Sequence, residues 1–201
     1  MIHARIGTYA KIGAGVVLAL ALALSVAGCG SKAANTAPTN ASAKEALPVA
    51  QSALSTMAPD AKLLVVQTSG AASPTSTITW SYLFGSPKSD KTYIVEVKAG
   101  KVVSASEYGA AGLTAAEWTA VPGADAWKID SAAAYKTAVT ASGANSAKSA
   151  YSMGFLTFLP SSETTSGTKA FVWYVSFDPS TSGASTGTIQ VDAKTGTVIA
   201  K

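Results

Sequence analysis

The chain is poor in the residues that carry most enzyme and metal chemistry. Its 201 residues include one cysteine (Cys29), one histidine (His3) and one arginine (Arg5). Histidine is the usual general base near neutral pH, and zinc, copper and haem sites depend on histidine or cysteine. Arginine is the residue that best holds phosphate or carboxylate in two-point contact. These shortages argue against hydrolases with a Ser-His-Asp or Cys-His site, against transition-metal sites and against nucleotide sites.

The N-terminal segment has the layout of a signal peptide. Arg5 and Lys11 make its start positive, and residues 12–27 are apolar apart from one serine. This apolar stretch is shorter than the roughly 20 residues that span a bilayer, which predicts a segment that is removed and not a permanent span. The run Leu24-Ser25-Val26-Ala27-Gly28-Cys29 resembles the lipobox of bacterial lipoproteins. Residues 1–28 are therefore predicted to be a signal peptide.

The lipobox resemblance implies cleavage before Cys29 and a diacylglycerol with palmitate-type chains on the Cys29 sulfur. Two acyl chains are enough for stable anchoring, because each buried methylene contributes about 0.8 kcal/mol. We therefore predict that Cys29 is the lipid-attachment site and that the protein lies on the extracytoplasmic face of the cell membrane. The alternative is an ordinary secreted protein whose cysteine falls by chance at a small-residue cleavage site.

Cleavage would also remove much of the remaining chemistry. Loss of residues 1–28 takes away His3, Arg5 and Lys11, so the formal charge falls from +4 to +2. Such a charge is too small for strong nucleic-acid binding, and a single cysteine cannot form an internal disulfide. Carboxylate-pair or Ser-Lys catalysis remains formally possible, but the acidic residues lie on separate segments and Ser166-Gly167-Thr168-Lys169 lies in a predicted loop. We predict that the protein is not an enzyme and has no catalytic residue, cofactor, metal or nucleic-acid partner.

The rest of the chain alternates predicted helices and strands after a small, polar, flexible tether at residues 29–41. Ser42 and Glu45 have the spacing of a capping box, and Asp130 is a good N-cap for a second helix that Gly143 would end. Runs rich in β-branched and aromatic residues predict strands. These strands are 62–68, 77–84, 91–98 and 101–106 in the first half, and 151–159, 169–177 and 188–200 in the second.

The two halves of the chain align with each other. Trp80-Ser81-Tyr82-Leu83-Phe84 matches Trp173-Tyr174-Val175-Ser176-Phe177. Downstream, residues 95–103 match residues 189–199, with a turn two residues longer in the second copy. Such self-similarity indicates a duplicated unit. The predicted organisation is a first repeat at 42–108, a connector at 109–128 and a second repeat at 129–201.

The end of the second half resembles a known family. The stretch Val191-Asp192-Ala193-Lys194-Thr195-Gly196-Thr197-Val198 is similar to the final hairpin of PepSY domains, which are small extracytoplasmic modules. Asp and Thr side chains can bond the backbone of such a turn, and Gly196 accepts a positive φ. The resemblance implies an α+β fold made of two PepSY-like repeats, each with one helix packed on a small antiparallel sheet. The first copy lacks the Asp and Thr of this motif.

Few side chains stand out from the predicted scaffold. Trp80 and Trp173 occupy matching positions on apolar faces, which favours packing beneath the helices over a ligand platform. The other face of these strands carries Leu83, Val172 and Tyr174, which could form a binding face or the contact between the repeats, and we favour the contact. The scattered lysines are expected to be solvated, with a weak attraction to anionic lipid or wall polymers. We also expect that Trp118 and Trp127 pin the connector to the repeats. Residues 178–183 are expected to form a hairpin turn and not a calcium loop.

These patterns predict a location better than an activity. The leading hypothesis is a non-enzymatic, lipid-anchored binding or regulatory lipoprotein whose partner is a peptide or a peptidase. The PepSY resemblance implies that class of partner, and an exposed sheet edge could bind an extended peptide as an added strand. The alternative is a structural or assembly component that docks on a membrane or cell-envelope complex.

Overall fold

The computed structural model describes residues 42–70, 72, 77–144, 150–157, 170–178 and 187–200. All of these residues belong to one compact unit, Pro38–Lys201. The predicted signal peptide, tether and Cys29 lie outside the described residues, so those assignments stay predictions.

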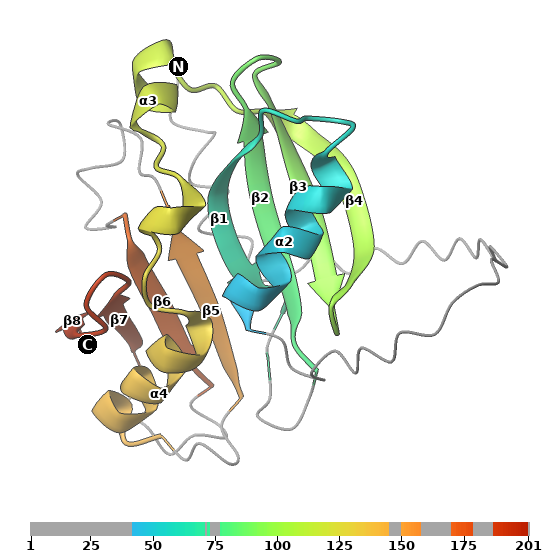
Figure 1. Ribbon diagram of the computed structural model, residues 1–201. Coiled ribbons are helices and arrows are strands. Elements are labelled where there is room, and N and C mark those ends of the chain that lie inside the picture. The colour runs from blue at the N-terminus through green and yellow to red at the C-terminus, as the bar shows by residue number, and fades with distance from the viewer. Residues whose placement is uncertain are drawn as a thin grey trace, which may run out of the picture. The chain divides into compact units, whose positions relative to one another are not determined.

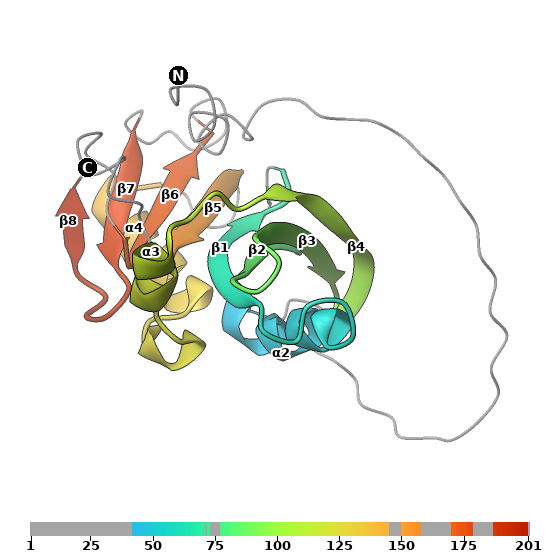
Figure 2. The same ribbon diagram turned by 90° about the horizontal axis from the view of Figure 1, so that it is seen from above.

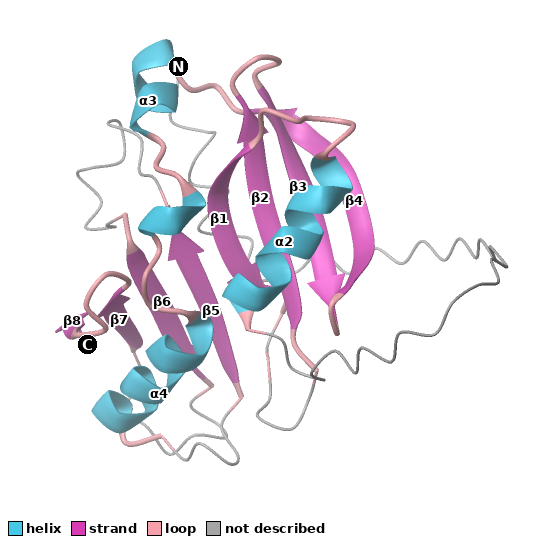
Figure 3. Cartoon of the chain, viewed as in Figure 1, coloured by secondary structure: helices cyan, strands magenta, loops and turns pink. Residues whose placement is uncertain are grey.

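Within the described residues the helices are short and the strands dominate (Figures 1 and 3). Four helical elements and eight strands follow one another along the chain. They are α2 (Ala43–Leu54), β1 (Lys62–Thr68), β2 (Thr79–Ser86), β3 (Lys91–Lys98), β4 (Lys101–Ala110), α3 (Ala115–Ala120), η1 (Ala124–Ala126), α4 (Ser131–Ser142), β5 (Tyr151–Leu156), β6 (Val172–Phe177), β7 (Thr188–Asp192) and β8 (Val198–Ala200).

All eight strands belong to one antiparallel sheet with the order β4-β3-β2-β1-β5-β6-β7-β8. The two halves join where β1 pairs with β5, with Val65 opposite Leu156 and Gln67 opposite Gly154. The predicted fold of two small separate sheets, each beneath its own helix, is therefore wrong. The physical reason is that the first strand of each half has an open side, and pairing these two sides satisfies backbone groups that would otherwise form two more edges. The described chain is mostly β.

The order of elements is nevertheless the same in both halves. Each half has one helix followed by four strands, and the sheet order runs outward from the central β1–β5 pair in both directions. A duplicated unit joined through its first strands would give this order. The duplication and its boundaries stay predictions.

Both long helices pack on the sheet. α2 contacts β2, β3 and β4, whereas α4 contacts β6, β7 and β8. Figure 2 shows that β1 to β4 curve over α2. The buried side of α2 is made of small and aliphatic residues, which lets the helix lie close to the strands; these residues are Ala43, Ala46, Leu47, Ala50 and Leu54. The hydroxyl of Tyr82 also donates to the carbonyl of Ala43 at 2.6 Å, and burial raises the pKa of Tyr82 far above its usual range.

The predicted hairpin at the end of the chain is confirmed. β7 and β8 pair across a turn in which the Asp192 carboxylate accepts hydrogen bonds from the backbone N–H groups of Lys194 and Thr195, both at 2.8 Å. These bonds lower the pKa of Asp192. Gly196 has a φ of +79°, a conformation that other residues adopt at a cost. The expected single strand over 188–200 is thus two strands.

Candidate functional site

The two matching tryptophans are part of the core. Trp80 and Trp173 are buried, and their rings meet edge to face with centroids 6.4 Å apart. Trp173 also stacks on Phe155 at 5.1 Å, and Trp127 from the connector packs against both at 5.1–5.6 Å. The indole N–H groups of Trp127 and Trp173 both donate to the carbonyl of Ile129, at 2.6 and 2.8 Å. The prediction that Trp80 and Trp173 pack in the interior is confirmed.

The connector is pinned on both faces of the sheet. Trp127 lies in the core beside the helices, as expected. Trp118 of α3 is buried on the other face, where a Cβ at Gly85 would collide with its ring. Lys62 of β1 donates to the Trp118 carbonyl at 2.8 Å. The glycine at position 85 therefore leaves the space that Trp118 occupies, and this part of the sheet is covered.

The side chains expected to form the contact between the halves do not form it. Leu83 and Tyr174 are half-buried and Val172 is buried, and they lie on two strands of one sheet, not on the facing sides of two sheets. The halves meet instead through the β1–β5 ladder and through the pair Trp80–Trp173. This expectation was wrong because it assumed two sheets that pack on each other, whereas the halves share one sheet.

A polar junction joins the first turns of the two long helices. The first three N–H groups of α2 are all bonded: Ala43 to the Ser131 hydroxyl, Lys44 to the Asp130 carboxylate, and Glu45 to the Ser42 hydroxyl. The same oxygen of Asp130 accepts from the N–H of Ser131 at 2.6 Å. One carboxylate therefore caps two helices that come from different halves of the chain. Capping and the positive ends of both helices stabilise the negative charge there.

Loss of this shared cap should be measurable. We expect Asp130→Ala to lower the free energy of unfolding by about 2 kcal/mol, because a cap is worth about 1 kcal/mol for each helix. Asp130→Asn keeps a carbonyl oxygen as acceptor and should cost less than about 1 kcal/mol. Urea unfolding of the chain from residue 29, followed by circular dichroism, measures both. Asp125→Ala, in exposed η1, is the matched control, and an equal loss in Asp130→Ala and Asp125→Ala would contradict the shared cap.

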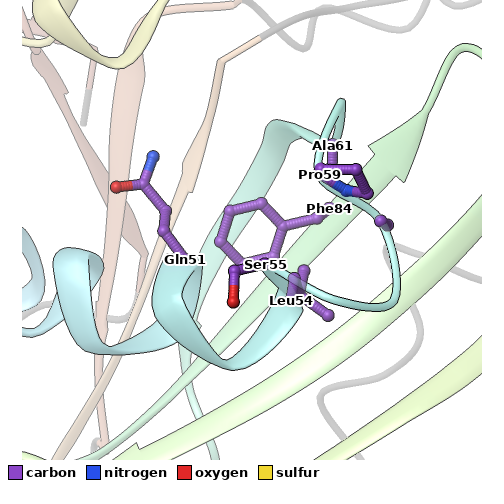
Figure 4. Close-up of a pocket in the computed structure, with 7 residues that line it drawn as sticks. Gln51, Leu54, Ser55, Pro59, Ala61 and Phe84 are labelled. Atoms are coloured by element: carbon purple, nitrogen blue, oxygen red, sulfur yellow. The ribbon is translucent and has the colours of Figure 1, made fainter.

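A small hollow of about 230 Å³ lies between the end of α2 and β2 (Figure 4). Its walls are largely apolar, with the ring of Phe84 at its centre and two uncharged polar side chains from the helix. The lining residues are Gln51, Leu54, Ser55, Ala58, Pro59, Ala61 and Phe84. None of them can act as an acid, a base or a metal ligand near neutral pH, so the hollow offers space for an apolar group and no catalytic chemistry.

Several acidic side chains of the described part bond to hydroxyl, N–H or ammonium groups. No group of three or more His, Cys, Asp or Glu side chains that could hold a metal ion occurs among the described residues. Asp60, for example, accepts bonds from the Ser86 hydroxyl and from the N–H of Lys88, and the backbone bond lowers its pKa. Asp60 thus serves a turn, whereas Glu96 accepts bonds from two serine hydroxyls and Glu107 pairs with Lys91. The Ser166–Lys169 motif and residues 179–183 lie outside the described residues.

The outer edge of the first half carries three of the five exposed large apolar side chains of the described part. β4 is a ten-residue edge strand, and all of its residues are exposed except the half-buried Gly109. Val102, Val103 and Tyr108 are 42%, 59% and 46% exposed. Such an edge presents unpaired N–H and C=O groups to any extended chain that meets it. The exposed apolar residues were the signal available in the sequence, but only the strand order shows that β4 is an edge.

Two bulges shape this edge. The register of β3 and β4 shifts between Thr92 and Tyr93 and again between Glu96 and Val97. The residues left without an opposite partner on β4 are Tyr108 and Val103. A bulge turns its extra side chain away from the regular pleat and interrupts the ladder. The two most exposed apolar residues of β4 are therefore the ones that the bulges present.

The other edge strand of the sheet, β8, also has a bulge, at the position that aligns with the second bulge of β4. The register of β7 and β8 shifts between Gln190 and Val191, which leaves Ile199 without a partner, and Ile199 is 38% exposed. In the alignment of the two halves, these positions correspond to the Glu96/Val97 shift and to Val103. β8 is short, with three residues, so the long open edge belongs to β4 alone.

Comparison with known proteins gives no family for this chain and a distant similarity to a solved structure. No protein-family model matches the chain, and neither does any curated protein. The chain is similar to a crystal structure from Clostridium difficile 630 that is described as a "putative lipoprotein" (CD1622), with 11% sequence identity and a TM-score of 0.49. The similarity covers 83% of this chain and 97% of that chain. The PepSY resemblance is not confirmed by these comparisons.

The described residues also contain no helix that is long and apolar enough to cross a membrane. The twelve-residue α2 and α4 are the longest helices of that part.

Proposed function

We propose that this protein is a non-enzymatic lipoprotein, anchored through Cys29 at the extracytoplasmic face of the cell membrane, that binds an extended segment of a partner protein along β4. The anchor rests on the lipobox resemblance and on the signal-peptide layout of residues 1–28. The binding mode rests on one observation, the long exposed edge of β4. The partner is a peptide or a protein with a strand-forming segment, such as a peptidase.

Strand addition is the binding mode that this edge supports best. An added strand gains main-chain hydrogen bonds from the edge, while alternate side chains give specificity. Tyr108 supplies an exposed apolar contact on this strand, and the ammonium group of Lys91 holds the carboxylate of Glu107 at 2.8 Å. The bulges at Val103 and Tyr108 interrupt the ladder, which disfavours an indiscriminate pairing of flat strands. A partner strand must therefore fit the spacing of the two bulges on β4.

Position-specific crosslinking in cells tests this proposal. A photoreactive phenylalanine analogue is placed in turn at Ser104, Ser106 and Tyr108, and the crosslinked partner peptides are identified by mass spectrometry. An antiparallel or parallel added strand should give crosslinks that move along one partner segment by about two residues for each step of two on β4. The same analogue at Lys136, exposed on α4, is the matched control.

Three results would count against strand addition. Crosslinks that do not progress along a single segment, a partner caught equally well from Lys136, or no crosslink at all would each contradict it. A partner caught from Lys136 and not from β4 would instead favour the alternative, an assembly component that docks through another surface.

A further inference from the structure

The β3–β4 hairpin places two lysines directly opposite each other. Lys98 ends β3 and Lys101 begins β4, and the ladder pairs them across the two-residue turn Ala99–Gly100. Like charges in directly opposed positions destabilise a hairpin. In the described part of the chain no hydrogen bond or ion pair joins either side chain to a carboxylate. The arrangement is unfavourable by itself and becomes favourable when an anion lies between the two ammonium groups.

The nearest carboxylate of the ladder is already engaged. Glu96 precedes Lys98 by two residues on the same strand, and its oxygens accept the hydroxyls of Ser69 at 2.7 Å and Ser104 at 3.1 Å. Side chains in opposed positions of an antiparallel pair have their Cβ atoms roughly 5 Å apart. Both lysines can therefore reach one phosphate group at the tip of the hairpin.

Apolar side chains follow this basic pair at once. Val102 and Val103 are 42% and 59% exposed, and Val103 is the bulged residue that points away from the regular pleat. A charged pair beside exposed aliphatic side chains is the composition of a surface that lies at a lipid headgroup layer, with lysines on the phosphates and aliphatic groups below them. A soluble anion would bind the lysines but would make no contact with the valines, whereas a lipid surface can contact both.

The hairpin also lies where an anchored chain would bring it to the membrane. Figure 1 shows the β3–β4 turn at the same end of the first four strands as the first turn of α2. The Tyr82 hydroxyl of β2 donates to the carbonyl of Ala43 at the start of α2, and Tyr82 pairs with Val95 of β3. Four residues of β3 lead from Val95 to the turn, a distance of about 13 Å along the strand. The segment 29–41 can span up to about 44 Å. The hairpin is thus within reach of the membrane that holds Cys29.

The aligned hairpin of the second half provides an internal comparison. It has the same bulge and the same aliphatic pair, Val198 and Ile199. The position aligned with Lys98 is however Asp192, whose carboxylate binds its own turn. The two hairpins share the bulge and differ in charge, and the turn of the second hairpin is two residues longer.

We propose that Lys98, Lys101, Val102 and Val103 form a second contact with the membrane, in which the β3–β4 hairpin binds the phosphates of anionic lipids and inserts its valines at the headgroup layer. This inference deepens the proposed function and rests on its anchoring part for a role in the cell. The contact would fix which way the domain faces, because a tethered surface needs little intrinsic affinity to stay bound. With the hairpin on the membrane, the distal part of β4 around Tyr108 remains open to a partner.

Vesicle binding tests the hairpin without depending on the anchor. The chain from residue 29 with Cys29→Ser has no lipid and, after Val103→Cys, a single thiol for an environment-sensitive nitrobenzoxadiazole label. All its described structure lies in the compact unit Pro38–Lys201, which this chain retains. Titration with phosphatidylglycerol vesicles should shift the label emission to the blue and increase its intensity. Phosphatidylcholine vesicles should give little change.

Two comparisons make the result specific. The same label at Ile199→Cys, on the second hairpin, should stay in water. Lys98→Gln with Lys101→Gln should weaken binding to phosphatidylglycerol vesicles about 30-fold, because each lysine near an anionic surface contributes about fivefold. Lys128→Gln with Lys136→Gln removes the same charge elsewhere and should change binding less than about twofold.

Each other outcome overturns the inference. A label at Val103 that stays in water on phosphatidylglycerol vesicles excludes the membrane contact. Equal losses in the two double variants would show a general charge effect, and equal signals at Val103 and Ile199 would show that no hairpin is favoured. Failure of the anchor is seen separately, as the absence of fatty acid on Cys29, and leaves the vesicle result unaffected.

Discussion

Replacing Cys29 by alanine is expected to abolish fatty-acid labelling of the protein and to remove its stable attachment to the membrane. The sulfur of Cys29 is the predicted site of the diacylglycerol, and no other cysteine is present to take its place. At about 0.8 kcal/mol for each buried methylene, two long acyl chains hold a protein at a bilayer far more firmly than one. Labelled palmitate fed to cells that express the full chain, followed by detergent-phase partition, measures the effect.

The control for this experiment is the neighbouring substitution Ser31→Ala, which should leave labelling unchanged. The mass of the mature N-terminus shows in addition whether the chain is cut before residue 29. Labelling that persists in Cys29→Ala, or a wild-type chain that takes up no fatty acid, would show that the lipobox resemblance is accidental. The chain would then be an ordinary secreted protein.

Truncating Trp173 to alanine is expected to cost about 3–5 kcal/mol of the free energy of unfolding. The side chain is completely buried and contacts Trp80, Trp127 and Phe155, so its loss opens a cavity at the place where the two halves meet. Domains of this kind are stable by about 5–15 kcal/mol, so the variant should lie near the limit of folding. Urea unfolding followed by circular dichroism measures the loss without relying on tryptophan emission.

The conservative variant Trp173→Phe separates volume from hydrogen bonding. It keeps a ring but gives up the bond to the Ile129 carbonyl, which still accepts from Trp127, so a loss of about 1–2 kcal/mol is expected. Tyr108→Ala, an exposed aromatic residue, should stay within about 0.5 kcal/mol of the parent. If Trp173→Ala were no more costly than Tyr108→Ala, the aromatic cluster would not be the centre of the core.

Local features of the fold were predicted well from the sequence. The capping box at Ser42 and Glu45, the N-cap at Asp130 and the left-handed Gly143 all occur in the structure as expected. These features were predictable because each depends on hydrogen bonds between residues a few positions apart. The hairpin around Asp192 belongs to the same class.

The arrangement of the strands could not be predicted in the same way. The pattern of residues along β1 and β5 is the same whether each strand ends a small sheet or lies at the centre of a large one. The pairing of Val66 with Phe155 joins residues about ninety positions apart, and no local rule specifies it. For the same reason the hydrogen bond between Asp130 and the backbone N–H of Lys44 could not be predicted. The sequence predicts Asp130 as the cap of α4, and the structure shows that it also caps α2.

The candidate site also combines features that the sequence shows with features that only the strand pairing shows. The exposed apolar residues of β4 and the lysines of its hairpin can be read in the sequence, where the lysines were expected to be scattered. Only the ladder shows that Lys98 and Lys101 face each other and that Val103 is bulged. In the alignment, Lys98 and Lys101 of the first hairpin correspond to Asp192 and Thr197 of the second, so the two hairpins differ in charge.

By itself the amino-acid sequence determined the positions of caps and turns. It also supports two predictions, an anchor at Cys29 and the loss of His3 and Arg5 on cleavage before that residue. These depend on composition and on neighbours along the chain. The tertiary structure alone decided that the two halves share one sheet, that β4 is an open edge, and that Lys101 of β4 lies opposite Lys98 of β3. Those features arise from backbone pairing between distant segments, which the free energy of the whole sheet selects and no single segment encodes.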